Sequence, residues 1–177
     1  MRIINGELSG RRPLIPKNLL ARPTTDVSRE GLFNILRNRL DFENSRVLDL
    51  FSGTGIISYE FASMGCRDIT SVERDRFHCA AIRKNFEFLD INTVRLIETD
   101  AFNFLKKDVH PFDFIFADPP YDHHQLISLP SLIIGKNRLR PDGFFVLEHG
   151  PDKNFKDFPG FAEERKYGKV HFSFFKD

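Results

Sequence analysis

The stretch from residue 118 to residue 121 carries the residue types in this chain best suited to chemistry. It reads Asp118-Pro119-Pro120-Tyr121 and directly follows an apolar run. Proline lacks a backbone N–H and has a fixed φ, so the stretch can be neither a central strand nor the interior of a helix. We predict a rigid loop at the carboxyl end of a strand, where open α/β sheets bind ligands. One carboxylate, rigid carbonyl groups and one aromatic ring would suit a planar group that bears an amine.

A second candidate site is a glycine-containing turn that follows a predicted buried strand over residues 47–51. Such a turn lets a ligand approach backbone N–H groups closely. A dinucleotide-binding fingerprint would need a third glycine at position 58, where the chain has Ser58, and Asp49 would repel a pyrophosphate. Asp49 instead suits a cationic ligand with an ammonium or sulfonium group. The residues of this candidate site are Asp49, Phe51, Ser52, Gly53, Thr54 and Gly55.

Two further acids follow predicted strands at 69–72 and 94–97. Glu73 lies at about the distance from the glycine turn at which nucleotide-binding folds place the acid that binds ribose hydroxyls. The Asp100 carboxylate could accept a hydrogen bond from an adenine amine while the N–H of Ala101 meets a ring nitrogen. Asp100 could also cap the helix that follows it. With the first two motifs, these acids place four carboxylates at successive strand ends, which predicts one ligand site along one edge of the sheet.

Strands and helices alternate along the chain from residue 46 onward. This alternation predicts a parallel, doubly wound α/β sheet with a terminal antiparallel hairpin as its edge. The predicted strands cover 47–51, 69–72, 94–97, 112–116 and 144–147, and the hairpin joins 162–167 to 170–175. The predicted helices cover 27–40, the region from the glycine turn to about 64, 75–89, 101–105 and 125–137. A turn is predicted at Pro141-Asp142-Gly143.

The N-terminal region differs from the rest of the chain in the spacing of its glycines and prolines and in its charge. Glycines and prolines interrupt short apolar pieces over residues 1–21, which favours a hairpin or arm rather than a helix. Residues 1–40 hold eight basic and three acidic residues, whereas the remainder holds 18 basic and 22 acidic ones. This asymmetry indicates either a phosphate-binding surface or an ordinary solvated basic surface.

Composition limits the class of protein. A chain of 177 residues with 41% hydrophobic and 29% charged residues is typical of a single globular domain. No apolar run reaches the roughly 20 residues that span a membrane, and the start lacks a signal peptide, so we expect a cytoplasmic protein. Cys66 and Cys79 match no metal spacing and suggest a reducing compartment. His123, His124 and His149 lack partners at ligand spacing, so we expect no metal site.

The order of these motifs resembles that of class I S-adenosylmethionine-dependent methyltransferases. Their Asn/Asp-Pro-Pro-Tyr/Phe motif is typical of enzymes that methylate an exocyclic amine of a nucleobase. The N-terminal region is similar to the RsmD family, whose members methylate N2 of a guanine in bacterial small-subunit (16S) ribosomal RNA, and the resemblance covers essentially the whole chain. The stretches that carry it are Ile4-Asn5-Gly6, Ser9-Gly10-Arg11-Arg12, Arg22-Pro23-Thr24-Thr25-Asp26 and Arg29-Glu30-Gly31-Leu32-Phe33-Asn34-Ile35-Leu36.

The resemblance implies a Rossmann-like fold with a seven-stranded, mostly parallel sheet and a C-terminal antiparallel hairpin. It also implies a small basic β-hairpin arm over residues 1–21 and a methyltransferase domain over residues 22–177. Ser28 and Gly31 depart from the family pattern, which usually has bulkier or more helix-favouring residues there, and this affects the local strength of the helix rather than the chemistry.

The resemblance also assigns roles to residues. The backbone of residues 51–55 would hold the methionine part of the cofactor, Glu73 its ribose, and Asp100 with Ala101 its adenine. The Asp118 carboxylate and the Pro119 carbonyl would accept the two amine hydrogens, and Tyr121 would stack on a base flipped out of its helix. Asp26 and Arg29 would close over the cofactor or receive the RNA. The residues that would meet RNA phosphates are Arg2, Arg11, Arg12, Lys17 and Arg22.

The resemblance implies methylation of a guanine N2 amine in small-subunit ribosomal RNA. A short arm and a single domain leave little surface to read naked RNA, which favours an assembled particle as substrate, and we expect a monomer. A DNA adenine-N6 methyltransferase uses the same tetrapeptide but usually carries a separate target-recognition segment. A non-catalytic RNA- or cofactor-binding module is a further alternative. The presence of both Asp118 and Tyr121 disfavours it. A nicotinamide oxidoreductase is disfavoured because the third glycine is absent.

Overall fold

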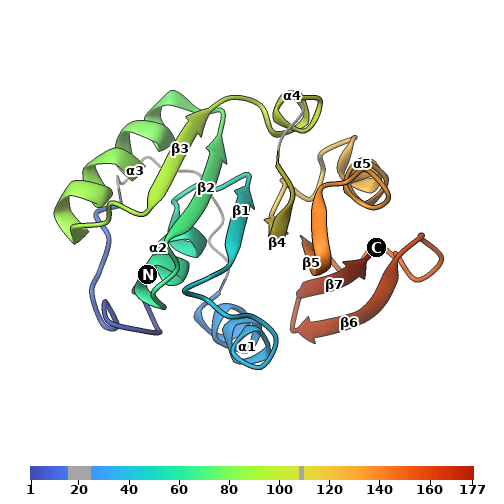
Figure 1. Ribbon diagram of the computed structural model, residues 1–177, viewed down its shortest axis with the longest axis horizontal. Coiled ribbons are helices and arrows are strands. Elements are labelled where there is room, and N and C mark those ends of the chain that lie inside the picture. The colour runs from blue at the N-terminus through green and yellow to red at the C-terminus, as the bar shows by residue number, and fades with distance from the viewer. Residues whose placement is uncertain (16–24, 108–109) are drawn as a thin grey trace.

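The computed structural model describes residues 1–15, 25–107 and 110–177. Within these residues seven strands form one sheet in the order β3-β2-β1-β4-β5-β7-β6 (Figure 1). The first five strands pair in parallel, whereas β7 runs antiparallel to both β5 and β6. The predicted mixed sheet with an antiparallel terminal hairpin is therefore confirmed. The strands are β1 (Arg46–Leu50), β2 (Asp68–Glu73), β3 (Val94–Glu98), β4 (Phe112–Ala117), β5 (Leu139–His149), β6 (Phe161–Tyr167) and β7 (Val170–Lys176).

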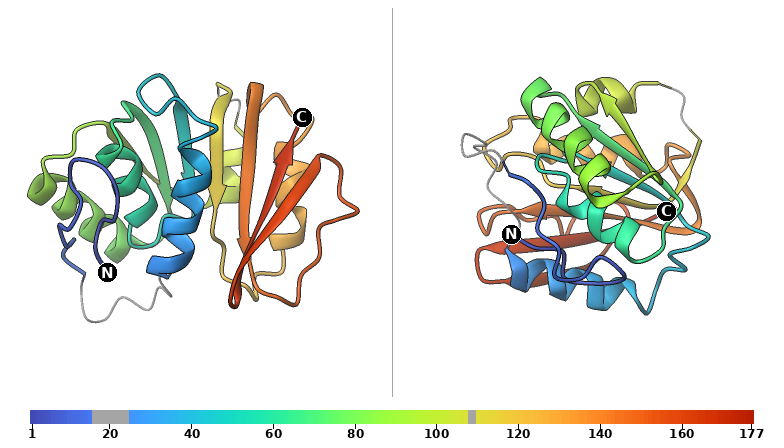
Figure 2. Two further views of the ribbon diagram at one scale, coloured as in Figure 1. Left: turned by 90° about the horizontal axis from the view of Figure 1, so that it is seen from below. Right: turned by 90° about the vertical axis from the view of Figure 1, so that its left-hand side faces the viewer.

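Helices cover both faces of the sheet, as the two views in Figure 2 show. Side chains of the first three helices pack in one hydrophobic core, and side chains of the later helices pack in a second core on the opposite face. None of the helices in the described ranges combines the length and apolar character needed to cross a bilayer. The helices are α1 (Asp26–Leu36), α2 (Ile56–Ser63), α3 (Arg76–Leu89), α4 (Ala101–Leu105), the 3-10 turn η1 (Leu126–Ser128) and α5 (Leu129–Ile133).

Strand β4 shows why the central strands read as continuous apolar runs. Phe114 and Phe116 belong to the core beneath α1 to α3, whereas Ile115 and Ala117 belong to the core beneath α4 and α5. Successive side chains of a strand point to opposite faces, so a strand covered by helices on both faces needs apolar residues at successive positions, as at 114–117 of β4. This burial fixes the register of β4 beside β1, and with it the position of the Asp-Pro-Pro-Tyr loop that follows.

Two predicted elements differ from the structure in the second half of the chain. Strand β5 begins at Leu139 and runs through the predicted turn at residues 141–143, where Asp142 has a φ of 66°. The register between β4 and β5 shifts at this point, so the turn signal marks an irregularity inside a strand. The region predicted as a helix over 125–137 contains only η1 and α5, and Gly135, with a φ of 67°, turns the chain after α5.

The prediction of an N-terminal β-hairpin is wrong for the described residues 1–15, which form a loop without strands. Two backbone hydrogen bonds close the loop, from Ile3 N to Arg11 O and from Gly10 N to Ile3 O, both 2.9 Å long. Gly6 and Gly10 have φ values of 75° and 84°, which bend the chain before a longer ladder can form. Ile3 is fully buried in the core beneath α1 to α3, so this loop packs on the sheet domain. Residues 16–21 of the predicted arm lie outside the described residues.

Candidate functional site

The turn between β1 and α2 exposes its backbone to a large cavity. Phe51 and Gly53 have positive φ values of 59° and 54°, and Gly55, with a φ of 80°, caps α2. A β-carbon at Gly55 would lie 2.7 Å from the hydroxyl oxygen of Tyr59, so the turn needs glycine at this position. The turn residues that line the cavity are Phe51, Ser52, Gly53 and Thr54.

Glu73 stands at the end of β2 beside this turn. Its carboxylate accepts hydrogen bonds from the backbone N–H groups of Gly53 (2.8 Å), Arg74 (2.9 Å) and Asp75 (2.8 Å). Three backbone donors hold the side chain in one orientation at the cavity wall. Glu73 is thus a fixed anionic group next to the glycine turn, as the sequence predicts.

The Asp-Pro-Pro-Tyr loop is attached to the sheet at both ends. The N–H of Asp118 donates to the carbonyl oxygen of Leu50 on β1 at 3.4 Å. The hydroxyl of Tyr121 donates to Oε1 of Glu148 at the end of β5, at 3.0 Å. A β-carbon at Gly150 would lie 3.0 Å from Cδ2 of the Tyr121 ring, so the ring is also held by close contact. Every residue from 118 to 121 lines the same cavity as Glu73.

The cavity has a volume of about 1410 Å³ and lies outside the carboxyl ends of the parallel strands. Pockets for a single small molecule usually span about 300–1,000 Å³, so this one is large enough for two ligands side by side. One part of its wall is formed by Glu73 and the glycine turn, and another by the loop at 118–121. The arrangement can hold a nucleotide-like ligand next to a planar amine.

Asp49 does not line this cavity, contrary to the expectation that it faces a cationic ligand directly. Its side chain is buried beneath the glycine turn, where the hydroxyl of Ser58 donates to its Oδ2 at 2.6 Å. Burial raises the pKa of Asp49 to about 7, against the lowering effect of that hydrogen bond. Ser58, which occupies the position of the absent third glycine, therefore serves as the partner of a buried acid.

The titration of Asp49 should be visible in the pH dependence of stability. A folded-state pKa above the unfolded value means that the native state binds the extra proton, so this contribution is present below about pH 4 and is lost as the pH rises to about 7. Relative to wild type, Asp49→Asn should gain roughly 2–4 kcal/mol in free energy of unfolding between these limits. Urea unfolding of both proteins at pH 4 and pH 8 measures the difference. A constant difference across that range would contradict the prediction.

Asp100 and Ala101 stand at the start of α4, as expected. The Asp100 carboxylate accepts a hydrogen bond from the N–H of Asn103 at 3.0 Å, so the predicted helix cap is present. Ala101 lines the cavity, whereas Asp100 is not among the lining residues. The capping bond occupies one carboxylate oxygen and leaves room for a second acceptor role.

Asp26 and Arg29 lie at the start of α1 and do not line the cavity. The Arg29 guanidinium is fully buried and donates through Nε to Oε1 of Glu60 at 2.9 Å. Its Nη2 donates to Oδ1 of Asp26 at 3.0 Å, and to the carbonyl oxygen of Arg2 at 2.6 Å. The structure therefore places Arg29 between α1, α2 and the N-terminal loop rather than against a ligand, whereas Asp26 is half exposed.

The basic residues of the N-terminal loop lie on the surface. The guanidinium of Arg11 lies 5.4 Å from the centre of the Phe88 ring and donates to the Phe88 carbonyl at 2.9 Å. Arg12 is exposed, and the side chain of Arg2 is 60% exposed with Nε 3.8 Å from Oδ2 of Asp26. Lys17 and Arg22 lie outside the described residues.

Several cavity residues were not predicted from the sequence. Glu148 is the second-last residue of β5, and Asp118 directly follows β4, so an acid near a strand end is a signal that could have identified Glu148 too. The turn between β6 and β7 also lines the cavity, through Tyr167 and Lys169. No local sequence motif predicts that these two residues belong to the site. Phe77, at the start of α3, lines the cavity with 85% of its surface exposed.

The chain is similar in sequence to a known family and to named proteins. Residues 1–176 match the family described as "Conserved hypothetical protein 95". "Ribosomal RNA small subunit methyltransferase D" of Buchnera aphidicola subsp. Acyrthosiphon pisum is 33% identical over 147 residues, which cover 82% of this chain and 76% of that protein. The protein of the same name from Escherichia coli K12 is 29% identical over 159 residues, covering 90% and 79%.

Solved structures show the same fold. A hypothetical protein from Thermus thermophilus superposes with a TM-score of 0.88 at 26% identity, covering 100% of this chain and 99% of that one. A 16S rRNA N2 G1207 methyltransferase from T. thermophilus, in complex with AdoMet and guanosine, gives a TM-score of 0.69 at 22% identity and covers 89% of this chain and 44% of that one. The fold is that of class I methyltransferases.

Proposed function

Because the chain belongs to the family described as conserved hypothetical protein 95, we propose that it is an S-adenosylmethionine-dependent methyltransferase that modifies the N2 amine of a guanine in small-subunit ribosomal RNA. The observation that carries the proposal is the meeting of two predicted sites in one cavity. Glu73 and the glycine turn form one part of its wall, and the loop at 118–121 forms another. Relatives over most of the chain are named as ribosomal RNA methyltransferases, which supports the choice of RNA as substrate.

The residues present fit S-adenosylmethionine. When bound, this cofactor supplies an electrophilic methyl group on a sulfonium. Glu73 would accept hydrogen bonds from ribose hydroxyls, and the N–H groups of residues 51–55 would hold the methionine part. Ala101 and Val72 offer an apolar wall for adenine, with Asp100 as a neighbouring acceptor. Asp49 would act from beneath the turn by holding its shape through Ser58.

The loop at 118–121 would activate the guanine N2 amine as a nucleophile. The lone pair of guanine N2 is delocalised into the ring, which makes the amine a poor nucleophile. Asp118 and the Pro119 carbonyl would accept its two hydrogens and aim the lone pair at the methyl group, after which Asp118 or water takes the released proton. Tyr121, fixed by Glu148, would stack on the flipped base. Pro120 keeps the loop rigid, and the proposed reaction uses no metal ion.

RNA would reach the cavity across the N-terminal loop. Arg2, Arg11 and Arg12 are the described basic residues there, and Lys17 and Arg22 belong to the same proposal by sequence. Neutralising phosphates with such residues gives affinity without sequence preference. We infer a cytoplasmic monomer that acts on an assembled small-subunit particle, in which residues 1–21 assist a methyltransferase domain over residues 22–177.

Methyl transfer from labelled S-adenosylmethionine tests the function directly. The substrates are undermethylated small subunits, naked 16S RNA and duplex DNA, and the product nucleoside is identified by mass spectrometry. N2-methylguanosine in RNA, with small subunits as the better substrate, is expected. N6-methyladenine in DNA would contradict the proposal, and so would cofactor binding without turnover on any substrate.

Glu73→Gln is expected to weaken S-adenosylmethionine binding by about 10- to 100-fold, because a hydrogen bond to a charged group contributes about 1.5–3 kcal/mol. Isothermal titration calorimetry measures the dissociation constant. Glu98→Gln is the matched control, since Glu98 pairs with Glu73 in the sheet register but does not line the cavity. Equal affinities of the two variants would remove Glu73 from the cofactor site.

A further inference from the structure

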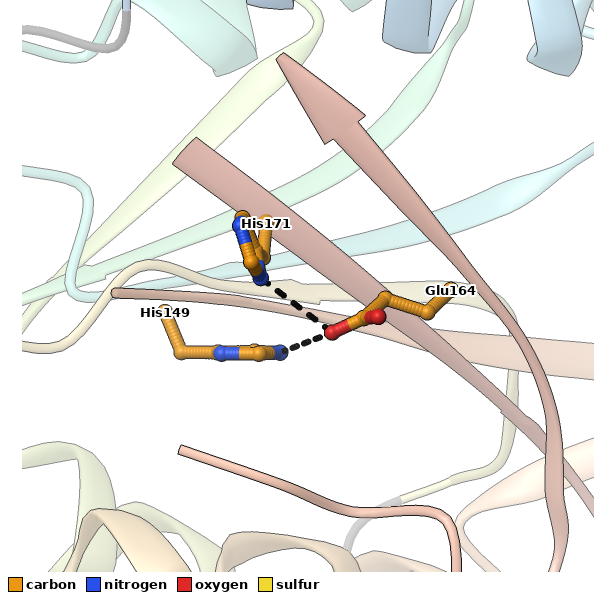
Figure 3. A group of neighbouring side chains, drawn as sticks. All are labelled: His149, Glu164 and His171. Atoms are coloured by element: carbon orange, nitrogen blue, oxygen red, sulfur yellow. Dashed lines mark hydrogen bonds and ion pairs between the residues drawn. The ribbon is translucent and has the colours of Figure 1, made fainter. Parts of the chain in front are cut away.

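Three side chains that could bind a metal ion meet at the C-terminal edge of the sheet. His149 ends β5, Glu164 lies on β6 and His171 on β7, so three neighbouring strands contribute one residue each. Figure 3 shows both rings directed at the same carboxylate oxygen. Oε1 of Glu164 lies 3.2 Å from Nδ1 of His171 and 4.0 Å from Nε2 of His149. One ligand atom from each residue lies within 4.8 Å of the other two.

The hydrogen bonds of His149 determine which ring nitrogen carries its proton. Nδ1 lies 2.8 Å from the carbonyl oxygen of Gly150, which can only accept, so Nδ1 is the protonated nitrogen. Nε2 therefore carries a single lone pair, which accepts from the hydroxyl of Ser173 at 2.8 Å and becomes available to a metal ion once that hydroxyl turns away.

The hydrogen bonds around His149 and Glu164 are those expected of metal ligands held in place by neighbouring groups. Histidines that bind metals usually donate their second ring N–H to a carbonyl or carboxylate, as His149 does to Gly150. The positive charge of Lys166 is directed to Oε2 of Glu164, at 3.1 Å, while Oε1 faces the two rings. His149 has no exposed side-chain surface, His171 has 8% and Glu164 has 15%, so the ligands are shielded yet open on the Glu164 side.

We propose that His149, Glu164 and His171 form a Zn²⁺ site that joins β5, β7 and β6. Two imidazoles and one carboxylate are a donor set that zinc takes, with ligand bonds of about 2.0–2.1 Å. Tetrahedral ligands at that range stand about 3.3 Å apart, so the 3.2 Å contact already fits and the 4.0 Å contact needs to close by about 0.7 Å. The two histidine nitrogens, which lie within 4.8 Å of each other, need to close by at most about 1.5 Å. Water or Ser173 completes the coordination.

The site would support the cavity without taking part in the reaction. His149 directly follows Glu148, whose carboxylate accepts the hydrogen bond from Tyr121. A metal on His149 would fix the carboxyl end of β5 against the terminal hairpin, and with it the carboxylate that orients the Tyr121 ring. The ion is structural, so its binding can be measured without any methyl-transfer substrate.

The test is a titration of the full-length, metal-stripped protein with Co²⁺ followed by visible absorption, together with thermal unfolding in Zn²⁺ or Mg²⁺. We expect one Co²⁺ per chain with ligand-field bands and no thiolate charge-transfer band. Zn²⁺ at about 100 times its dissociation constant should raise Tm by about 5–10 °C, and Mg²⁺ should not. Glu164→Gln and His171→Ala should lose both effects.

A double variant of two exposed histidines, His110→Ala with His124→Ala, is the matched control and should bind the metal as wild type does. Circular dichroism of the metal-free variants separates loss of the site from loss of the fold. A Tm that Zn²⁺ leaves unchanged would overturn the proposal. So would equal binding by Glu164→Gln, or a thiolate band that assigns the metal to Cys66 or Cys79.

Discussion

Asp118→Ala is expected to lower the rate of methyl transfer to ribosomal RNA by about 10²–10⁴-fold, the usual contribution of a positioned group that accepts a proton. The amine must lose its conjugation with the ring before its lone pair can attack, and the carboxylate is the strongest acceptor in the loop at 118–121. Cofactor affinity should stay within about twofold of wild type, because Glu73 and the glycine turn are untouched. Single-turnover assays with labelled cofactor measure the rate, and calorimetry measures the affinity.

Asp118→Asn distinguishes the two roles of this side chain. The amide keeps an oxygen in the same place but cannot take the proton, and a neutral acceptor is weaker than a charged one. We expect a loss of about tenfold if positioning dominates, and a loss close to that of Asp118→Ala if proton removal does. Near-wild-type methylation by Asp118→Ala, with binding intact, would remove Asp118 from the chemistry.

The candidate site was predictable where it depends on the ends of parallel strands. Glu73 and Asp118 come at or just after predicted strand ends and Ala101 lies shortly after another, and parallel strands bring their carboxyl ends to one edge whatever the details of packing. Those three residues line one cavity in the structure. The alternation of apolar runs with amphipathic segments also predicted the sheet and its terminal hairpin, because periodicity reflects which faces are covered.

The remaining features depend on contacts between segments distant in sequence. Asp49 occupies a strand end like the other acids, yet its side chain is buried against Ser58, and nothing in the local pattern separates it from an exposed acid. His149 had no partner at ligand spacing along the chain, and only the pairing of β5 with β7 and of β7 with β6 brings Glu164 and His171 to it. Arg29 was expected to close over the cofactor or receive the RNA only because the family resemblance implied it, and the sequence does not show that Glu60 on α2 buries its guanidinium.

Glu60 explains why Arg29 is buried, and its substitution should have a large effect on stability. The Glu60 carboxylate is fully buried and accepts from Nε of Arg29 at 2.9 Å and from the N–H groups of Ile4 (2.8 Å) and Asn5 (3.0 Å). Glu60→Gln leaves the buried guanidinium without its main counter-charge and places an amide against backbone donors. We expect a loss of about 3–5 kcal/mol in free energy of unfolding, measured by urea denaturation.

Glu43→Gln is the matched control, since Glu43 also pairs with an arginine but does so in solvent. Its carboxylate lies 3.8 Å from Arg67, and the two side chains are 68% and 74% exposed, so the change should cost less than about 0.5 kcal/mol. Similar losses of unfolding free energy in both variants would show that the buried Glu60–Arg29 pair contributes no more to stability than an exposed pair.

The Glu60 variant should also release the N-terminal loop. Because glutamine has one acceptor oxygen where glutamate has two, the amides of Ile4 and Asn5 can no longer both be bonded, and hydrogen exchange there should quicken more than at the centre of β4. The same carboxylate that neutralises Arg29 holds the loop bearing Arg11 and Arg12, so the proposed RNA contacts depend on a buried ion pair that does not line the cavity. If the variant keeps its fold at low temperature, its affinity for RNA should fall while its affinity for S-adenosylmethionine stays unchanged, which separates placement of the loop from integrity of the cofactor site.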